Sequence, residues 1–355
     1  MATRQLIAAA RSAVVAVTET PRALTGLAIA RIGIAVSQAS LYTADYAQRH
    51  MLHGPDGVFP REQVSTAGTF NLYVAAGESV LAFEALYHLG LALCVAMALG
   101  VGGRAAIVGV WATSWSLWGA NPMLIDGGDN VAMVVLPMLA VSMCCDRLSV
   151  RTGWAWAVEV RRRSRGWLAV LLSNAAAFGV MVQLCIVYFL SGMYKAQGEM
   201  WVDGTALYYI MRTPEYFYPP LSPLILENDA AIVVGTYAAM VTLIAFPFLV
   251  LSRSVRPWAV AAMLGFHASI GLFMGLTSFA LAMMACDCVF VSGHAERAVG
   301  AVRARLQPAL ETLRRRMAPL GADLVRDPAP APEPLAVPAS GVRTDQPVAA
   351  RAAVP

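Results

Sequence analysis

Residues 190–204, LSGMYKAQGEMWVDG, combine side chains that can carry acid–base chemistry. Lys195 lies at the end of an apolar run, and Trp201 follows it. A lysine amine acts as a base only while it is uncharged, and partial burial at a membrane rim disfavours the charged ammonium. The same side chain could instead extend its amine to the lipid headgroups. Lys195 is therefore a candidate base at the edge of a membrane-embedded site.

A polar turn, NPMLIDGGDN at residues 121–130, holds a second candidate group. Its glycines allow a tight turn, and Asp129 is well placed to cap the helix that follows. Alternatively, Asp129 and Asn130 face Lys195 and contribute to the same site.

Two ionisable side chains lie inside apolar runs. His267 either packs with a hydrogen-bond partner or belongs to an interior polar site, because ionisable groups are costly at membrane depth. Arg31 has the same alternatives, and we expect an interior partner such as Asp287 or a polar headgroup.

An aromatic and proline-rich stretch follows Lys195 along the chain. Its aromatic members are Tyr208, Tyr209, Tyr216, Phe217 and Tyr218. Such residues are typical of membrane–water interfaces. Flat rings would also suit a lid over a ligand that itself has a flat ring.

The composition identifies the elements that must position these residues. Of the 355 residues, 58% are hydrophobic and 14% are charged, and the mean hydropathy is +0.60, which is too apolar for a soluble domain of this size. Runs long enough to cross a bilayer lie at residues 24–46, 76–99, 105–120, 131–145, 167–189, 230–251, 258–276 and 277–291. We therefore expect an all-α, polytopic bundle of about eight transmembrane helices.

Arginines set the expected orientation, because basic connections stay on the cytoplasmic side. They lie before the first run, after the last run and in alternate connections between them. Eight helices with both termini in the cytoplasm satisfy this pattern. The polar connections at residues 46–62, 121–130 and 195–229 then share the extracytoplasmic face of the cell membrane.

The chain divides into four expected parts. Residues 1–22 are a basic amphipathic lead-in at the membrane surface, and residues 23–293 are the transmembrane domain. Residues 294–326 form a basic cytoplasmic amphipathic helix on the anionic lipid surface. Residues 327–355 are rich in Pro and Ala, too poor in large apolar residues to bury a core, and expected to be disordered.

Other classes of chemistry lack their motifs. The six cysteines lie within the apolar runs without further Cys or His at ligand spacing, so we expect no metal site and no disulfide framework. The sequences GxxxxGK[ST], HExxH and GxSxG are absent. We expect the lipid bilayer as a partner and no nucleic acid.

Residues 184–211, LCIVYFLSGMYKAQGEMWVDGTALYYIM, resemble a signature of the vitamin K-dependent γ-carboxylase and its bacterial relatives, the HTTM (horizontally transferred transmembrane) family. The residues that match are Tyr188, Phe189, Gly192, Lys195, Trp201 and Gly204. Residues 266–285, which begin with Phe266 and His267, are similar to a second family segment. The first apolar run with Arg31 is a weaker match.

The resemblance implies a catalytic group and a cofactor. Lys195 would deprotonate a reduced quinone of the vitamin K type, with Asp129, Asn130 and His267 as further catalytic residues. The cofactor-binding residues would be Arg31, Tyr188, Trp201 and Tyr208. Where the γ-carboxylase has an Asn–His pair, this chain has Asp129–Asn130, and no large lumenal region is apparent. Another substrate or a separate extracytoplasmic partner protein is therefore expected.

Two other functions stay open. Some bacterial relatives, the sporulation-delaying toxin maturation proteins, are tied to toxin production, so the chain could serve the maturation or export of a secreted peptide. A small-molecule transporter would instead predict internal repeats and broken helices in two halves, and the sequence contains no convincing repeat.

Overall fold

The computed structural model describes residues 15, 17–59, 70–150 and 166–322. The expected lead-in at residues 1–22 lies largely outside these residues, and the expected tail at residues 327–355 lies entirely outside them. Within the described ranges, all regular secondary structure is helical. This confirms the all-α class.

The expected apolar runs coincide with eight longer helices in the described part of the chain. These are α2 (Leu24–Ala44), α6 (Val80–Leu99), α7 (Arg104–Ala120), α8 (Gly127–Val141), α10 (Trp167–Ala196), α14 (Asp229–Leu249), α15 (Arg256–Phe273) and α16 (Thr277–Asp287). Each of them packs against the next one along the chain, and α16 packs against α2. The contacts between the eight helices therefore form a closed ring.

Length and composition make four of these helices candidate membrane spans, namely α2, α6, α10 and α14. A fifth candidate arises if α16 and the start of α17 (Ser292–Ala322) count as one span, although the two meet at 106°. Helix α8 is apolar but shorter. The described residues thus support a membrane protein with four or five candidate spans.

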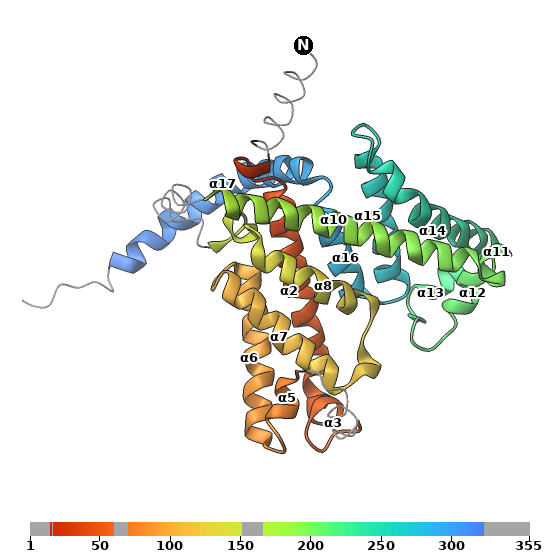
Figure 1. Ribbon diagram of the computed structural model, residues 1–355, viewed down its shortest axis with the longest axis horizontal. Coiled ribbons are helices and arrows are strands. Elements are labelled where there is room, and N and C mark those ends of the chain that lie inside the picture. Colours follow the sequence, from red (N-terminus) through yellow and green to blue (C-terminus); the bar gives the residue numbers. More distant parts are fainter. Residues whose placement is uncertain (1–14, 16, 60–69, 151–165, 323–355) are drawn as a thin grey trace, which may run out of the picture. The chain divides into compact units, whose positions relative to one another are not determined.

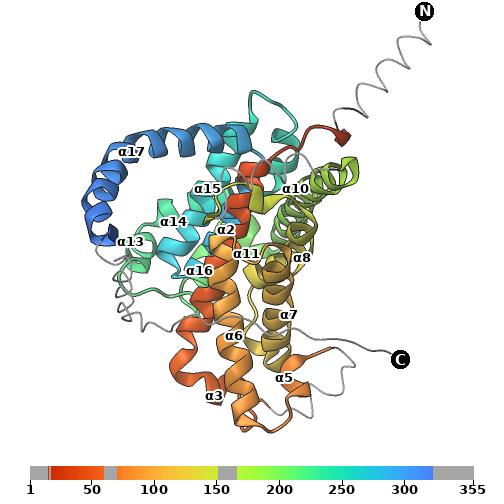
Figure 2. The same ribbon diagram turned by 90° about the vertical axis from the view of Figure 1, so that its left-hand side faces the viewer.

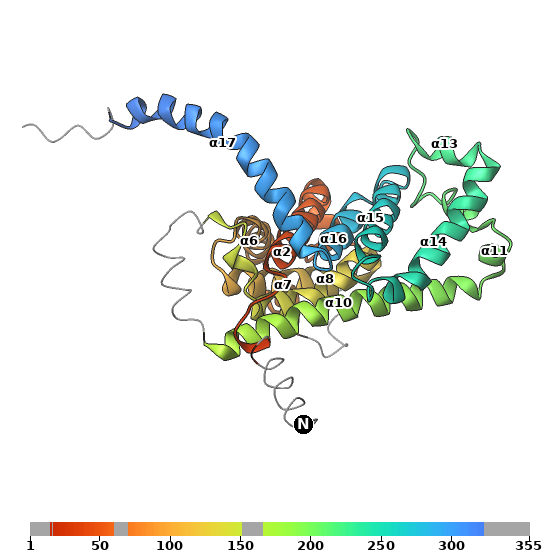
Figure 3. The same cartoon turned by 90° about the horizontal axis from the view of Figure 1, so that it is seen from above.

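The helices of the ring do not share one axis. Figures 1 and 3 show α10 running across α8 and α16, with α14 beside it. With 30 residues, α10 is about 45 Å long, whereas the hydrocarbon core of a bilayer is about 30 Å thick. Three short helices gather where α10 ends and α14 begins: α11 (Glu199–Val202), α12 (Ala206–Ile210) and α13 (Ser222–Leu226).

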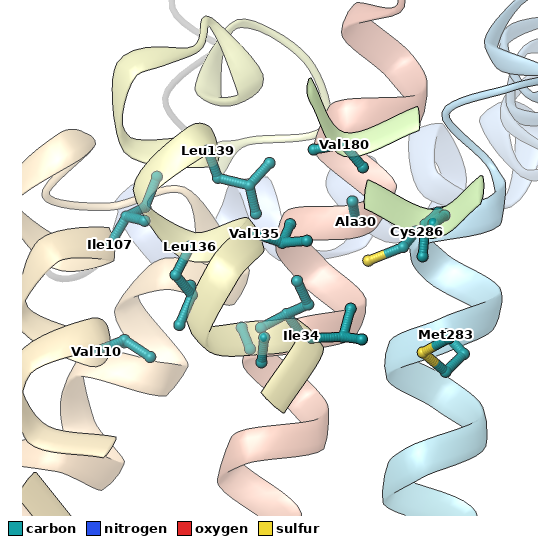
Figure 4. Close-up of a cluster of buried hydrophobic side chains, with 14 of the residues drawn as sticks. Ala30, Ile34, Ile107, Val110, Val135, Leu136, Leu139, Val180, Met283 and Cys286 are labelled. Atoms are coloured by element: carbon teal, nitrogen blue, oxygen red, sulfur yellow. The ribbon is translucent and has the colours of Figure 1, made fainter. Parts of the chain in front are cut away.

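The centre of the ring is apolar. Figure 4 shows side chains of α2, α7, α8, α10 and α16 meeting there; those labelled are Ala30, Ile34, Ile107, Val110, Val135, Leu136, Leu139, Val180, Met283 and Cys286. Helices in lipid associate through such close packing, supplemented by polar contacts. One of these contacts is a 2.9 Å hydrogen bond from Ser37 Oγ to the carbonyl of Ser278, which fastens α2 to α16.

Short helices cover one end of α2 and α6, as Figure 2 shows for α3 (Arg49–His53) and α5 (Leu72–Ala75). Arg49 Nη2 lies 2.8 Å from Oε1 of Glu84 on α6, and this carboxylate raises the pKa of Arg49. The ion pair holds the connection against α6. The 3₁₀ turns η1 (Tyr46–Gln48), η2 (Pro122–Leu124) and η3 (Cys144–Asp146) complete the described elements.

The described residues up to Ala301 form one compact unit, and those from Val302 onwards belong to a second. The described part of the second unit belongs to α17. Helix α17 covers residues 294–322 of the expected basic amphipathic helix, and residues 323–326 lie outside the described part. Its contact with lipid stays a prediction.

Candidate functional site

A cavity of about 770 Å³ lies among α10, α14, α15 and α16, and residues between α10 and α14 close one of its sides. Most of its lining is apolar or aromatic, while Ser191, Lys195 and His267 are among its few polar side chains. Small-molecule sites typically have this size and this mixture of apolar walls with few polar groups. The cavity is therefore the candidate functional site.

Lys195 stands in the wall of this cavity near the last turn of α10. Its Nζ donates a hydrogen bond of 2.8 Å to Ser191 Oγ, one turn earlier, and lies 5.2 Å from the centroid of the Trp201 ring. A cation at this distance is attracted by the face of an indole ring. The described residues contain no carboxylate within ion-pair distance of Lys195. The amine is thus oriented without an anionic partner that would hold its proton.

The structure explains why two positions of the segment that contains Lys195 are glycines. A Cβ at Gly192 would lie 2.6 Å from Cγ1 of Ile244 and 3.1 Å from Cβ of Leu243, so only a glycine lets α10 approach α14 this closely. Gly204 has a φ of 74°, in the left-handed region that glycine adopts without strain. These glycines bring the two walls of the cavity together and turn the chain after Trp201.

Three buried side chains from three helices meet at the second polar position of the cavity. The hydroxyl of Tyr188 on α10 donates a hydrogen bond of 2.8 Å to Oδ1 of Asp287 on α16. Nε2 of His267 on α15 lies 3.1 Å from the Tyr188 oxygen. Tyr188 and His267 also line the cavity. The aromatic rings of Phe246 and Phe279 make edge contacts with them, so the polar cluster has an apolar surrounding.

The side chains of Asp129 and Asn130 make hydrogen bonds at the N-terminal end of α8. Asp126 is the N-cap residue and accepts from the amides of Gly128 and Asp129, while Oδ2 of Asp129 accepts from the amide of Asp126 at 3.1 Å. This is a capping box. Oδ1 of Asp129 also accepts from Gln38 Nε2 on α2 at 3.2 Å, and exposed Asn130 donates to the carbonyl of Asp126. Asp126 lines the cavity, whereas Asp129 and Asn130 are outside its lining.

Arg31 is fully buried on α2, but away from the cavity lining. Its guanidinium donates to the carbonyls of Cys144, Ala98 and Leu148. These carbonyls lie at or beyond the C-terminal ends of α6 and α8, where a helix leaves acceptors without an intrahelical partner. Arg31 thus joins two helix ends instead of pairing with Asp287.

The aromatic stretch contributes one ring to the cavity. Tyr216 lines it, whereas Tyr208 lies outside the lining. The ring of Tyr208 instead stands 4.0 Å from the guanidinium carbon of Arg212 and 5.3 Å from the ring of Tyr209. The segment is anchored to α15, because Ser222 Oγ donates to the carbonyl of Phe273 at 2.7 Å.

The structure therefore brings together four of the predicted site residues around one cavity: Lys195, Tyr188, Trp201 and His267. It places Asp129, Asn130, Arg31 and Tyr208 outside the lining. Sequence reasoning missed Ser191, although a hydroxyl one turn before a lysine is within reach on a helix. It also missed the role of Asp287, whose position in an apolar helix was the available signal.

The described residues contain no group of three or more His, Cys, Asp or Glu side chains that could hold a metal ion. A reduced quinone, the cofactor that the resemblance implies, would fit the lining of the cavity. Its rings match the apolar walls, and its hydroxyl groups match Lys195 and the buried, unpartnered Nδ1 of His267.

Comparison with known proteins gives a family and two relatives. The family model described as "HTTM domain" matches residues 79–294, more than half of the chain. The chain is 26% identical over 204 residues to the uncharacterized protein YitO of Bacillus subtilis, covering 54% of this chain and 62% of the relative. It is 23% identical over 225 residues to the sporulation-delaying protein SdpB of the same organism, covering 61% of this chain and 66% of the relative. The chain thus spans less than two thirds of the length of either relative. No solved structure shows a significant match.

Proposed function

Because this chain belongs to the HTTM domain family, we propose that it is a membrane enzyme in which Lys195 acts as a base on a reduced quinone or a peptide substrate. The observation that carries the proposal is the position of Lys195. Its amine is held by Ser191 and Trp201 at the wall of a largely apolar cavity of about 770 Å³.

The presence of a lysine, and not an arginine, at position 195 supports its proposed role as a base. Lys195 is the single lysine among the 26 lysines and arginines of the chain, so every other strongly basic side chain is an arginine. A guanidinium stays protonated in proteins, whereas an amine can lose its proton. The one side chain that is able to accept a proton as a neutral amine lies in the cavity wall.

Each group at the cavity has a defined task in this proposal. A bound reduced quinone would supply aromatic hydroxyl groups as proton donors. Lys195 Nζ accepts one of these protons and becomes an ammonium. Ser191 Oγ and the face of Trp201 then stabilise the new charge, the first by accepting a hydrogen bond and the second through its π electrons. The apolar walls keep water away from the proton transfer.

We place the protein in the cell membrane with about eight helices that cross or enter the bilayer, with both termini in the cytoplasm. Support for this topology comes from the alternation of arginine-rich connections and from the eight helices that occupy the expected runs. The cavity side of Lys195 then faces the extracytoplasmic space. A secreted peptide or an extracytoplasmic protein would have access to it from there.

A second function is favoured by one specific observation, the similarity to the sporulation-delaying protein SdpB. In this alternative the protein is a non-catalytic membrane factor for the maturation or export of a secreted peptide. The cavity would then hold an apolar peptide side chain, and Lys195 would bind a carboxylate or a backbone carbonyl.

Anaerobic binding of a short-tailed naphthohydroquinone to the detergent-purified protein separates these functions. The wild-type protein is expected to bind it, and Lys195→Met is expected to weaken binding while the protein elutes as a folded particle. Tyr209→Phe is a matched control, because Tyr209 is 53% exposed and outside the cavity lining. Failure of the wild-type protein to bind would contradict the quinone proposal and favour peptide maturation.

A further inference from the structure

The cluster of Tyr188, His267 and Asp287 has a defined arrangement of hydrogen atoms. The three side chains are at most 1% exposed and come from α10, α15 and α16. The contacts are 2.8 Å from the Tyr188 hydroxyl to Asp287 Oδ1 and 3.1 Å from the Tyr188 oxygen to His267 Nε2. Within the described residues, Nδ1 of His267 is a buried atom without a hydrogen-bond partner.

With Asp287 as a carboxylate, which can only accept, the single hydrogen of the Tyr188 hydroxyl is used in the bond to Asp287. The Tyr188 oxygen can therefore only accept at its other contact, so His267 Nε2 must be the donor there. A neutral imidazole carries one N–H. Nδ1 consequently has a lone pair and no hydrogen. In the alternative, a doubly protonated ring, the positive charge would lie 3.9 Å from Oδ2 of Asp287. The hydrogen on Nδ1 would then be a buried donor without a partner, which is costly.

His267 belongs to the same cavity as Lys195. Both residues line it, and Tyr188, the partner of His267, lies two turns before Lys195 on α10. Two turns of helix correspond to about 10 Å. The lining thus includes an amine and an imidazole acceptor among apolar side chains such as Val187 and Leu243.

We propose that His267 Nδ1 accepts a hydrogen bond from a hydroxyl group of the ligand, and that Tyr188 and Asp287 are positioning residues that keep Nδ1 an acceptor. The cavity then selects the reduced, hydroxyl-bearing form of a quinone over its oxidised form. This inference rests on the proposed function and adds to it the means by which the redox state of the ligand is recognised.

The selectivity follows from complementarity. A hydroquinone presents an O–H to the lone pair of Nδ1 and makes a hydrogen bond. The corresponding quinone presents a carbonyl oxygen, so that two acceptors face each other and the buried Nδ1 stays unpaired. Leaving a buried polar group unpaired has a cost that corresponds to about tenfold or more in affinity.

The test compares the reduced and oxidised forms of one short-tailed naphthoquinone, titrated anaerobically into the detergent-purified full chain. Wild-type protein is expected to bind the reduced form about tenfold more tightly than the oxidised form. Asp287→Asn introduces an N–H donor toward the Tyr188 oxygen, which turns the Tyr188 hydroxyl toward Nε2 and moves the imidazole hydrogen to Nδ1. This variant is expected to lose or reverse the preference.

A second variant and a second readout keep the test independent of folding and of catalysis. Tyr188→Phe removes the partner of Nε2 and should reduce the preference, whereas Tyr209→Phe should leave it unchanged. ¹⁵N NMR of histidine-labelled protein without ligand should show His267 with an unprotonated Nδ1 and a protonated Nε2, assigned by the loss of its signals in His267→Gln. In Asp287→Asn the two nitrogens should exchange roles.

The outcomes separate the inference from the proposed function. Equal affinity of the wild-type protein for the two forms, or a protonated Nδ1, would overturn the inference while the quinone site stands. A preference that survives in Asp287→Asn would overturn the role of the positioning residues. Binding of neither form would overturn the proposed function and, with it, the inference.

Discussion

Replacing Gly192 by alanine tests whether close contact between α10 and α14 shapes the cavity. The new Cβ would lie 2.6 Å from Cγ1 of Ile244 and 3.1 Å from its backbone nitrogen. A backbone atom cannot turn aside as a flexible side chain can, so the helices must separate. Overpacking of this kind typically costs about 1–3 kcal/mol.

A matched control isolates this cost. Gly265, in the middle of α15, has no heavy atom within 4 Å of an added Cβ. In both helices alanine stabilises the helical backbone by about 0.5–1 kcal/mol relative to glycine. The difference between Gly192→Ala and Gly265→Ala is therefore the packing term alone, about 1–3 kcal/mol against Gly192→Ala.

Unfolding by SDS in mixed micelles, followed by circular dichroism, measures this difference. Gly265→Ala should unfold at a higher SDS fraction than the wild type. Relative to Gly265→Ala, Gly192→Ala should unfold at a clearly lower fraction, and it should also bind the naphthohydroquinone more weakly, because α10 carries Lys195. Equal stabilisation by the two substitutions would refute the close approach of α10 and α14.

Three further predictions use the same assays. Arg31→Leu leaves three carbonyl acceptors without their donor. The free energy of unfolding should therefore fall by about 1–3 kcal/mol for each buried carbonyl that stays unpaired. A change below about 0.5 kcal/mol would argue that Arg31 does not hold the ends of α6 and α8 together. Asp126→Ala removes the N-cap of α8 and should lower the free energy of unfolding by about 0.5–2 kcal/mol. Asn130 is exposed, so Asn130→Ala should change this free energy by less than about 0.5 kcal/mol. Equal effects of the two substitutions would contradict the capping role of Asp126. Ser191→Ala should weaken naphthohydroquinone binding less than Lys195→Met does, because it removes only the hydrogen-bond partner of the amine. A larger effect of Ser191→Ala would contradict the assignment of Lys195 as the group that contacts the ligand.

The helices could be predicted from the sequence, because an apolar run of this length in a membrane protein is almost always an α-helix. The expected run at residues 24–46 became α2 (Leu24–Ala44), and that at residues 230–251 became α14 (Asp229–Leu249). Helix α10 continues to Ala196, beyond the expected residue 189, so that Ser191 and Lys195 still belong to the helix. The crossing of α10 over its neighbours could not be predicted, since it depends on tertiary packing.

The proximity of Lys195 and Trp201 could be expected from the sequence, because they are only six positions apart. Contacts between residues that lie far apart in the chain could not be predicted. Tyr188 and Asp287 are separated by 99 positions, and only the packing of α10 on α16 brings them together. Likewise, the acceptors of Arg31 are backbone carbonyls, which every residue has, so no side-chain pattern in the sequence indicates them.

The most direct test of the central claim is the accessibility of the Lys195 amine to an amine-selective acylating reagent, read by mass spectrometry. Lys195 is the single lysine of the chain, so the modification reports this side chain, and the N-terminal amine is an internal control for the reagent. Lys195 should be acylated in the free protein and protected by the naphthohydroquinone, while the N-terminal amine should react equally in both samples. Unchanged acylation of Lys195 at a saturating ligand concentration would contradict the placement of the ligand at this amine.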